Sequence, residues 1–494
     1  MRKIDPQVAW QLFDIETTRR IEQLAAQRLP AHTLMQRAGL ATAKLALALA
    51  PHARRVWIAA GPGNNGGDGL EAAAHLHTYG KQVVVTWLGT PERSPADAVA
   101  SWRHAADAGV DFTAQPPDQF DLAVDALLGI GATRAPDGLM AQWISHMNSG
   151  GAPILAVDMP TGLSADTGHA GPTCVRASAT LCLLTLKPGL FTAFGRDASA
   201  QAWLDELQVD LMADGLPDVA APCASLLGPP AFQVPPHTSH KGSFGDVAVV
   251  GGAPGMVGAA LLAATAALHC GAGRVFMAPL DDAAMTVDWA QPELMVRRVG
   301  QLDMKHSAVV CGCGGGDAVR AVLPATLSTA SSLVLDADAL NAIAIDNQLK
   351  AQLRARSARH WRTILTPHPL EAARLLGITT AEVQGDRLAA ARRIAQQYGC
   401  TVVLKGSGTV IASPGQRPCI NPTGNYLLAS AGTGDVLAGA IGAALAHGLA
   451  EFAAACRAVY MHGLCANNWP AGTALSASAL AAALRPPRSG QPQS

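Results

Sequence analysis

The sequence predicts an α/β protein of two domains, each built on a mostly parallel sheet. Short apolar runs alternate with longer segments of helical periodicity through most of the chain. This alternation is typical of βαβ units, in which helices cover both faces of a parallel sheet. The length of 494 residues allows two or three domains, and one proline-rich break near the middle favours two.

In the first half, the elements follow in strict alternation. Buried strands are predicted at residues 56–60, 83–88, 122–127 and 154–157, and helices at 34–49, 69–79, 96–108 and 139–148. Between Pro217 and Pro236 stand six prolines, a density that neither a helix nor a central strand accepts. We therefore predict a first domain at 1–220 and a linker at 221–236.

The second half repeats the pattern, over a predicted domain at 237–484 and a flexible tail at 485–494. Strands are predicted at residues 247–250, 308–311, 333–335, 363–365 and 401–404, and helices at 256–269, 338–345, 370–376, 381–397 and 435–445. Residues 247–273 carry no charge and are long enough to span a bilayer, but glycines and a proline interrupt them. We interpret them as a strand, a turn and a buried helix.

The composition excludes several classes of protein. Hydrophobic residues make up 49% and charged residues 15%, and the net charge is −1. Such a chain is not disordered, and it has no basic surplus for a nucleic-acid backbone. The ten cysteines are scattered, and no apolar signal segment follows Met1. We therefore expect a cytoplasmic protein that binds neither nucleic acid nor membrane, and we interpret Cys311 and Cys313 as small turn residues rather than zinc ligands.

Polar groups follow three strands of the first half. Residues 61–69 read GPGNNGGDG, and five glycines in nine residues before a helix suit close approach to an anion. Asp125 ends the third strand and Asp158 the fourth. Each feature alone fits a tight turn or a helix cap. Because the carboxyl ends of parallel strands share one edge of a sheet, their combination favours a ligand site.

These motifs resemble the YjeF N-terminal domain, a family of NAD(P)H-hydrate epimerases, over about residues 10–210. The matching segments are NNGGDG at 64–69, DALLGIG at 125–131 and VDMPTGLSADTG at 157–168. The resemblance implies a Rossmann-like three-layer α/β/α fold. It also implies that Asn65, Asp125 and Thr161 hold K⁺, with Asp125 near the chemistry as a catalytic residue. The substrate-binding residues that it implies are Asn64, Asn65, Gly66, Gly67, Asp68, Gly129, Ile130, Gly131, Ala132, Thr133, Arg134, Ala135 and Asp158.

The most specific motif of the chain lies in the second half, where AGTGDVLAG at 431–439 opens a helix. Its glycines and the helix N-terminus form an anion hole, and Asp435 beside it can accept a proton from a substrate hydroxyl. Upstream, a strand ends in Lys405 and a glycine-rich turn, where a cation and backbone amides can meet a diphosphate; a β-hairpin there is equally compatible. His368 lies between two prolines, which suits either a binding or a structural position.

Together these segments resemble the carbohydrate-kinase-like NAD(P)H-hydrate dehydratases from about residue 237 to 470, which implies a ribokinase-like α/β/α fold. The family pattern GPGLG appears here as GCGGG at 312–316. The resemblance implies substrate contacts from Ala253, Gly316, His368 and the catalytic Asp435. It implies nucleotide contacts from Lys405, Gly406, Ser407, Gly408, Thr409 and Gly434.

Both halves thus resemble enzymes that act on one damaged cofactor. The implied protein is a bifunctional repair enzyme that epimerises the R and S forms of hydrated NADH and NADPH (NADHX and NADPHX). It dehydrates the S form with Mg²⁺ at the expense of ADP, and we expect a homo-oligomer. The residues alone leave two alternatives open: a small-alcohol kinase, and a first half that only binds nucleotide.

Overall fold

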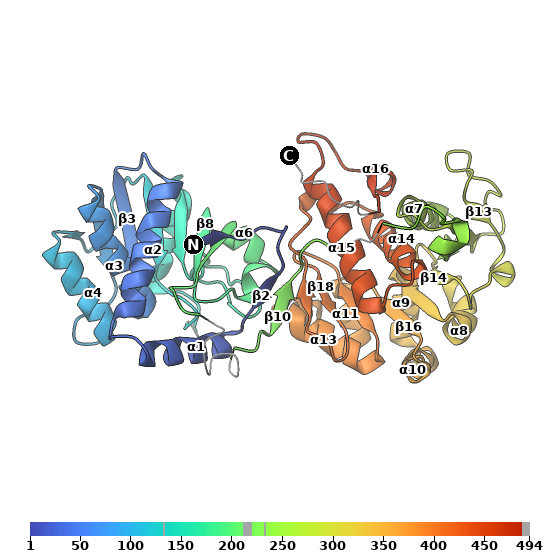
Figure 1. The fold of residues 1–494 in the computed structure, drawn as a ribbon, viewed down its shortest axis with the longest axis horizontal. Coiled ribbons are helices and arrows are strands. Elements are labelled where there is room, and N and C mark those ends of the chain that lie inside the picture. Colours follow the sequence, from blue (N-terminus) through green and yellow to red (C-terminus); the bar gives the residue numbers. More distant parts are fainter. Residues whose placement is uncertain (132–133, 211–219, 232–233, 487–494) are drawn as a thin grey trace. The chain divides into compact units, whose positions relative to one another are not determined.

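The computed structural model describes residues 1–131, 134–210, 220–231 and 234–486. It divides into two compact units, one of residues 1–5 and 10–224 and the other of residues 6–9 and 225–494. Both are α/β units with mostly parallel sheets, as the sequence predicts (Figure 1). The exact domain boundaries, including the tail, stay a prediction.

The sheet of the first unit has the strand order β1-β9-β8-β7-β6-β3-β4-β5 and is parallel except at β1, which pairs antiparallel with β9. Its strands are β1 (Arg2–Lys3), β3 (Arg55–Ala60), β4 (Gln82–Trp87), β5 (Asp111–Phe112), β6 (Leu122–Ala126), β7 (Ile154–Val157), β8 (Ala179–Leu183) and β9 (Gln201–Asp205); β2 (Trp10–Leu12) is a further short strand. Its helices are α1 (Ile15–Gln27), α2 (Thr33–Leu49), α3 (Asn64–Thr78), α4 (Ala96–Asp107), α5 (Gly138–Ser149) and α6 (Gly195–Ser199).

Strand β3 shows why this sheet is covered on both faces. Val56, Ile58 and Ala60 belong to one buried cluster with residues of α2 and α3. Trp57 and Ala59 point the other way and pack in a second cluster with α5. Because side chains alternate along a strand, a continuous apolar run needs two covering layers.

The second unit repeats this architecture on the strand order β13-β12-β11-β14-β15-β16-β17-β18-β19-β10. Its strands are β10 (Ala224–Leu226), β11 (Asp246–Gly251), β12 (Arg274–Pro279), β13 (Met295–Val296), β14 (Ala308–Cys311), β15 (Ser332–Leu335), β16 (Arg362–Leu365), β17 (Thr401–Leu404), β18 (Val410–Ala412) and β19 (Cys419–Ile420). In this sheet, β18 pairs antiparallel with β17 and β19. Its helices are α7 (Val257–His269), α8 (Val319–Thr329), α9 (Ala337–Ile345), α10 (Asn347–Ala355), α11 (Pro369–Leu376), α12 (Thr380–Gly385), α13 (Arg387–Tyr398), α14 (Thr433–Ala446), α15 (Glu451–Asn467) and α16 (Ala477–Ala483).

Two helix predictions are wrong, one at its start and the other because the helix is interrupted. The helix predicted at 69–79 begins at Asn64, because close packing overrides the low helix propensity of glycine. A Cβ atom at Gly66 would lie 1.9 Å from the Gly61 carbonyl oxygen. The helix predicted at 381–397 is two helices, because Asp386 ends α12 and caps α13 by accepting a hydrogen bond from the Ala389 amide.

One further segment differs from its prediction, and another confirms its prediction. Within the predicted linker, Ala224–Leu226 forms β10, and Ser225 lies opposite Cys419 in β19. The uncharged stretch 247–273 folds as β11, a turn and α7. In the part of the chain that the structure describes, every helix is too short or too polar to cross a bilayer.

Candidate functional sites

The first candidate site is a cavity of about 540 Å³ in the N-terminal unit. Its wall comes from α1, the start of α2, the start of α3 and the segments that follow β6 and β7. Of the residues predicted from sequence, those that line it are Asn64, Asn65, Asp68, Gly129, Ile130, Gly131 and Asp158. Gly66 and Gly67 are buried in α3 and Arg134 and Ala135 are exposed, while Ala132 and Thr133 lie outside the described residues.

The glycine-rich loop is held by contacts within the protein. A Cβ atom at Gly61 would lie 1.8 Å from the Leu127 carbonyl oxygen, so only glycine fits there. Gly63 caps α3 and has open space around it. The side-chain amide nitrogen (Nδ2) of Asn65 is buried without a hydrogen-bond partner. Leaving a buried donor unpaired costs free energy unless a ligand accepts its hydrogen bond.

Asp125 is fully buried and is not among the residues that line this cavity. Its carboxylate accepts hydrogen bonds from the Thr161 amide (2.8 Å), the Thr161 hydroxyl (2.7 Å) and the Leu127 amide (3.2 Å). Burial raises the pKa of Asp125 to about 6, although these three bonds act to lower it. Asp125 therefore anchors the loop from Leu127 to Gly131, which does line the cavity.

The oxygen atoms of Asn65, Asp125 and Thr161 are suitable ligands for a hard monovalent cation. Asp125 and Thr161 lie together and offer carboxylate and hydroxyl oxygens. The side-chain oxygen of Asn65 stands 3.1 Å from where a Cβ atom of Gly129 would be. An all-oxygen donor set of this kind suits K⁺ better than a thiophilic metal.

A buried ion pair stands at the end of β7. Lys187, which has no exposed side-chain surface, donates to Asp158 at 2.5 Å and to the Leu183 carbonyl at 2.9 Å. Asp158 has a left-handed backbone, with φ of 64°, and its other oxygen accepts from the Ile130 amide at 3.3 Å. A non-glycine residue in this conformation is strained and is common at functional sites.

Two more carboxyl groups share the cavity. Burial raises the pKa of Asp68 well above its usual value, and the nearby Asp158 and Glu22 charges raise it further. Burial, followed by Asp158, also raises the pKa of Glu22, against Lys187 and Arg19. Both carboxyl groups therefore hold a proton more readily than an exposed acid does, which is common at functional sites. Sequence reasoning missed Glu22, which lies in a helix without a motif, and gave Lys187 no role.

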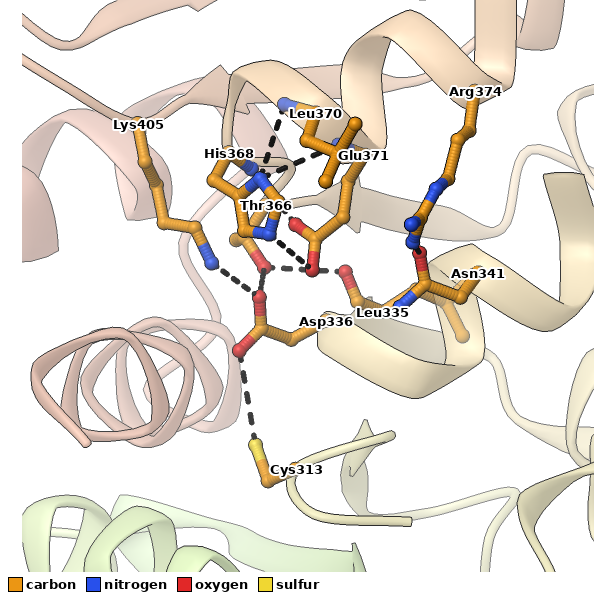
Figure 2. A network of polar contacts seen from close by, with 10 residues as sticks. All are labelled: Cys313, Leu335, Asp336, Asn341, Thr366, His368, Leu370, Glu371, Arg374 and Lys405. Atoms are coloured by element: carbon orange, nitrogen blue, oxygen red, sulfur yellow. Dashed lines mark hydrogen bonds and ion pairs between the residues drawn. The ribbon is translucent and has the colours of Figure 1, made fainter. Parts of the chain in front are cut away.

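The second candidate site lies at the carboxyl edge of the C-terminal sheet, and Figure 2 shows part of it. The Lys405 ammonium lies 2.7 Å from Asp336 Oδ1, which also accepts from the Thr366 hydroxyl at 2.7 Å. Burial alone would lower the pKa of Lys405, but the carboxylates of Asp336 and Glu371 raise it. The lysine is therefore charged and poised for an anion.

Asp435 stands in the first turn of α14, behind the left-handed cap residue Gly432. A Cβ atom at Gly434 would lie 3.3 Å from the Lys405 ammonium, which places the anion hole beside this cation. Burial, followed by the Asp336 charge, raises the pKa of Asp435 to about 6. A partly exposed carboxylate of this basicity suits a general base.

Residues 405–409 form the turn between β17 and β18, so the hairpin and the binding interpretations are indeed compatible. Arg387 supports this turn by donating to the carbonyls of Leu404 and Lys405, each at 3.1 Å. Gly406 follows with φ of 136°, beside the same guanidinium. The sequence contains no signal that would have linked Arg387 to this turn.

His368 caps α11, and its Nδ1 accepts from the amides of Leu370 (3.1 Å) and Glu371 (3.3 Å). Its Nε2 lies 3.3 Å from Glu371, as Figure 2 shows. Burial lowers the pKa of His368 and raises that of Glu371 to about 7. Because Nδ1 accepts these two hydrogen bonds, the ring proton of a neutral His368 lies on Nε2, toward Glu371. The half-exposed edge of the ring is available to a ligand.

The remaining predicted contacts lie beside the second site. The Ala253 amide donates to the Gly314 carbonyl at 2.7 Å, and Gly316 donates to Asp338 at 2.8 Å. Sequence reasoning gave no role to Asp336. The rule that revealed Asp125 and Asp158, an acid directly after a buried strand, applies equally to Asp336 after β15.

Comparisons with known proteins match both units of the chain. Residues 31–189 match the model of the YjeF-related protein N-terminus, and residues 247–485 match that of NAD(P)H-hydrate dehydratase. The bifunctional NAD(P)H-hydrate repair enzyme Nnr of Escherichia coli is 36% identical over 94% of this chain and 90% of its own length. That of Coxiella burnetii is 34% identical over 92% and 94%.

Among solved structures, the ADP/ATP-dependent NAD(P)H-hydrate dehydratase of Bacillus subtilis, co-crystallised with ATP and Mg²⁺, is 31% identical. The match covers 51% of this chain and 92% of that one, with a TM-score of 0.44. The identity to the full-length relatives extends through both units and settles the assignment. The chain belongs to the family of bifunctional NAD(P)H-hydrate repair enzymes.

Proposed function

We propose that this chain repairs hydrated NADH and NADPH, with an epimerase in its N-terminal unit and an ADP-dependent dehydratase in its C-terminal unit. The observation that carries the dehydratase assignment is the cluster of Lys405, Gly434 and Asp435. It places a cation, a helix N-terminus and a base of raised pKa at one edge of the sheet.

The dehydratase reaction follows from this arrangement. Asp435 accepts the proton of the ring hydroxyl, whose oxygen then attacks the terminal phosphorus of ADP, and AMP leaves. Lys405 and the amides at the start of α14 stabilise the charge on the transferred phosphoryl group. Phosphate then leaves the ring carbon, and loss of a proton from the neighbouring carbon restores the double bond. Phosphorylation thereby replaces hydroxide by a better leaving group.

We assign the remaining contacts as follows. Lys405, Gly406, Ser407, Gly408, Thr409 and Gly434 bind the nucleotide, and Ala253, Gly316 and His368 bind the hydrated nicotinamide. Mg²⁺ would arrive with the nucleotide phosphates, where it neutralises charge. The family relationship supports this proposal, as does the position of the Lys405 ammonium beside Gly434.

In the epimerase, we propose that the residues lining the cavity bind the hydrated nicotinamide ring and the phosphates of the dinucleotide. Asn65, Asp125 and Thr161 hold K⁺, which would place charge beneath the loop at 127–131 and help to order it. Asp125 then acts on the reaction through this loop and the ion, while Asp68 and Asp158 face the substrate and the enclosed Lys187 holds Asp158 in place. The unpartnered side-chain amide nitrogen of Asn65 and the raised pKa of Asp68 support this division.

The decisive experiment mixes purified protein with both hydrate epimers and either ADP or ATP. We expect complete recovery of the reduced-nicotinamide absorbance, with AMP and phosphate as products from ADP. A stable phosphorylated product without recovered absorbance would instead indicate a small-alcohol kinase. Recovery of only the S epimer would indicate that the N-terminal unit merely binds nucleotide.

Three broader expectations accompany this proposal. We propose that the substrates are NADHX, NADPHX and ADP, that the protein works in the cytoplasm, and that it forms a homo-oligomer. Each is separately measurable, by competition between substrates, by fractionation and by light scattering.

A further inference from the structure

Three potential metal ligands meet in the C-terminal unit. The sulfur of Cys313 and one carboxylate oxygen each of Asp336 and Asp435 all lie within 4.8 Å of one another. Cys313 and Asp336 are almost completely buried, and Asp435 is partly exposed. Bond lengths of about 2.3 Å to sulfur and 2.0–2.2 Å to oxygen place neighbouring ligands in a tetrahedral zinc site roughly 3.5 Å apart. The distance of 4.0 Å between Cys313 Sγ and Asp336 Oδ2 needs only a small contraction.

The charges of the cluster leave room for a cation. Lys405 and Thr366 both contact Asp336 Oδ1, so Oδ2 is directed toward Cys313 instead, as Figure 2 shows. The two carboxylates exceed the single lysine by one negative charge. When a divalent ion binds, the thiol loses its proton to solvent, and the set of one thiolate, two carboxylates, one ammonium and one ion becomes neutral.

The ligand types also select the kind of ion. A thiolate favours Zn²⁺ and similar thiophilic ions over Mg²⁺, which prefers oxygen and keeps its waters. The sulfur stands at the position where the family pattern GPGLG has proline, and proline offers no ligand.

We infer that Cys313, Asp336 and Asp435 form a binding site for a thiophilic divalent cation such as Zn²⁺, and that its occupation switches off the C-terminal reaction. The ion would occupy the carboxylate that must accept the substrate proton. The inhibitory half of this inference rests on the proposed role of Asp435, whereas the binding half does not.

Binding is tested first, without any turnover, by titrating the full chain with Co²⁺ as a spectroscopic probe. We expect one equivalent to produce a thiolate-to-cobalt charge-transfer band that Zn²⁺ abolishes. The band should vanish in Cys313→Ala and persist in Cys311→Ala, a matched change two residues away in the same C-x-C. Absence of the band in the unchanged chain, or its survival in Cys313→Ala, would overturn the site.

Inhibition is tested second, with Zn²⁺ added to separate assays of the two activities. We expect Zn²⁺ to inhibit S-epimer dehydration and to spare epimerisation. The inhibition constant should rise at least about tenfold in Cys313→Ala, measured against that variant's own basal rate and with the same nucleotide present. Binding that depends on Cys313 but leaves dehydration unchanged would overturn the inhibitory half alone. Absence of any dehydration would refute the proposed function and leave the cobalt result to decide the site.

Discussion

The two sheet edges hold their acids in different ways. Burial raises the pKa of both Asp125 and Asp435 to about 6. Asp125, however, accepts three hydrogen bonds from Thr161 and Leu127 and is fully buried, whereas Asp435 stands partly exposed at the start of a helix. A raised pKa alone therefore does not identify a proton acceptor. We therefore propose that the first acid serves as an anchor and ion ligand, and the second as a base.

Each edge also carries a buried lysine–aspartate pair, Lys187–Asp158 in one and Lys405–Asp336 in the other. The first lysine has no exposed surface and also bonds a backbone carbonyl, while the second keeps 18% of its side chain exposed. We therefore expect Lys187–Asp158 to contribute more to the free energy of unfolding. Lys405 is exposed enough to bind a phosphate. Four substitutions test this contrast.

Asp435→Asn should have the largest effect on activity. It keeps the size of the side chain but removes the proton acceptor, so we expect S-epimer dehydration to fall by about 10²–10⁴-fold. Repair of both epimers stops, because the R epimer must pass through the S form. Epimerisation, followed by chromatography of the two forms, should continue at the unchanged rate. Loss of both activities would point to misfolding rather than to a missing base.

Asp125→Ala should affect only the N-terminal activity. Without the anchor, the loop at 127–131 loses its position, and use of the R epimer should drop to the rate of spontaneous epimerisation. Dehydration of pure S epimer should be unchanged, as measured by recovery of absorbance. K⁺ should stimulate the unchanged chain and not the variant. Normal R-epimer turnover in Asp125→Ala would refute its role.

The two lysines should separate stability from binding. Lys187→Met leaves Asp158 buried and unpaired, so we expect a loss of about 3–5 kcal/mol in the unfolding free energy. Lys405→Met should lose less stability, because Thr366 still donates to Asp336, but should raise the KM for ADP at least about tenfold. Urea denaturation and steady-state kinetics measure the two effects. Equal losses of unfolding free energy in Lys187→Met and Lys405→Met would refute the proposed difference between the two pairs.

The smallest effect concerns His462 of α15, which contacts the start of α14. His462 is buried with its Nε2 3.0 Å from the Thr433 carbonyl, and burial lowers its pKa from 6.5 to about 4. Between pH 6.5 and 4, His462 binds a proton in the unfolded chain but not in the folded one. His462 therefore lowers the free energy of unfolding as pH falls from 6.5 to 4, by at most about 3 kcal/mol. Below pH 4 it causes no further loss.

His462→Gln should flatten this part of the pH profile of unfolding, measured by urea denaturation at several pH values. His237→Gln, at an exposed position, serves as the control and should leave the profile unchanged. An unaltered profile in His462→Gln would mean that other groups cause the acid lability.

Much of this arrangement is predictable from the sequence because it depends on local patterns. Apolar runs locate most of the strands, and acids after them reveal Asp125 and Asp158. The pairing of Lys405 with Asp336 was not predictable, since 69 residues separate them and only the order β15-β16-β17 brings their strand ends close. Glu22 was missed because α1 contributes to the cavity through tertiary packing, which no periodicity encodes.

The packing of the glycine loop also makes mutational tolerance informative about function. A side chain at Gly61 or Gly66 would collide with backbone, so both positions should reject substitution even when selection acts on folding alone. Gly63 has open space, and its replacement should matter only when selection acts on catalysis. Two libraries of the same loop, one sorted for soluble protein and one for growth under cofactor damage, would thus separate residues that build the loop from residues that leave space for its ligand.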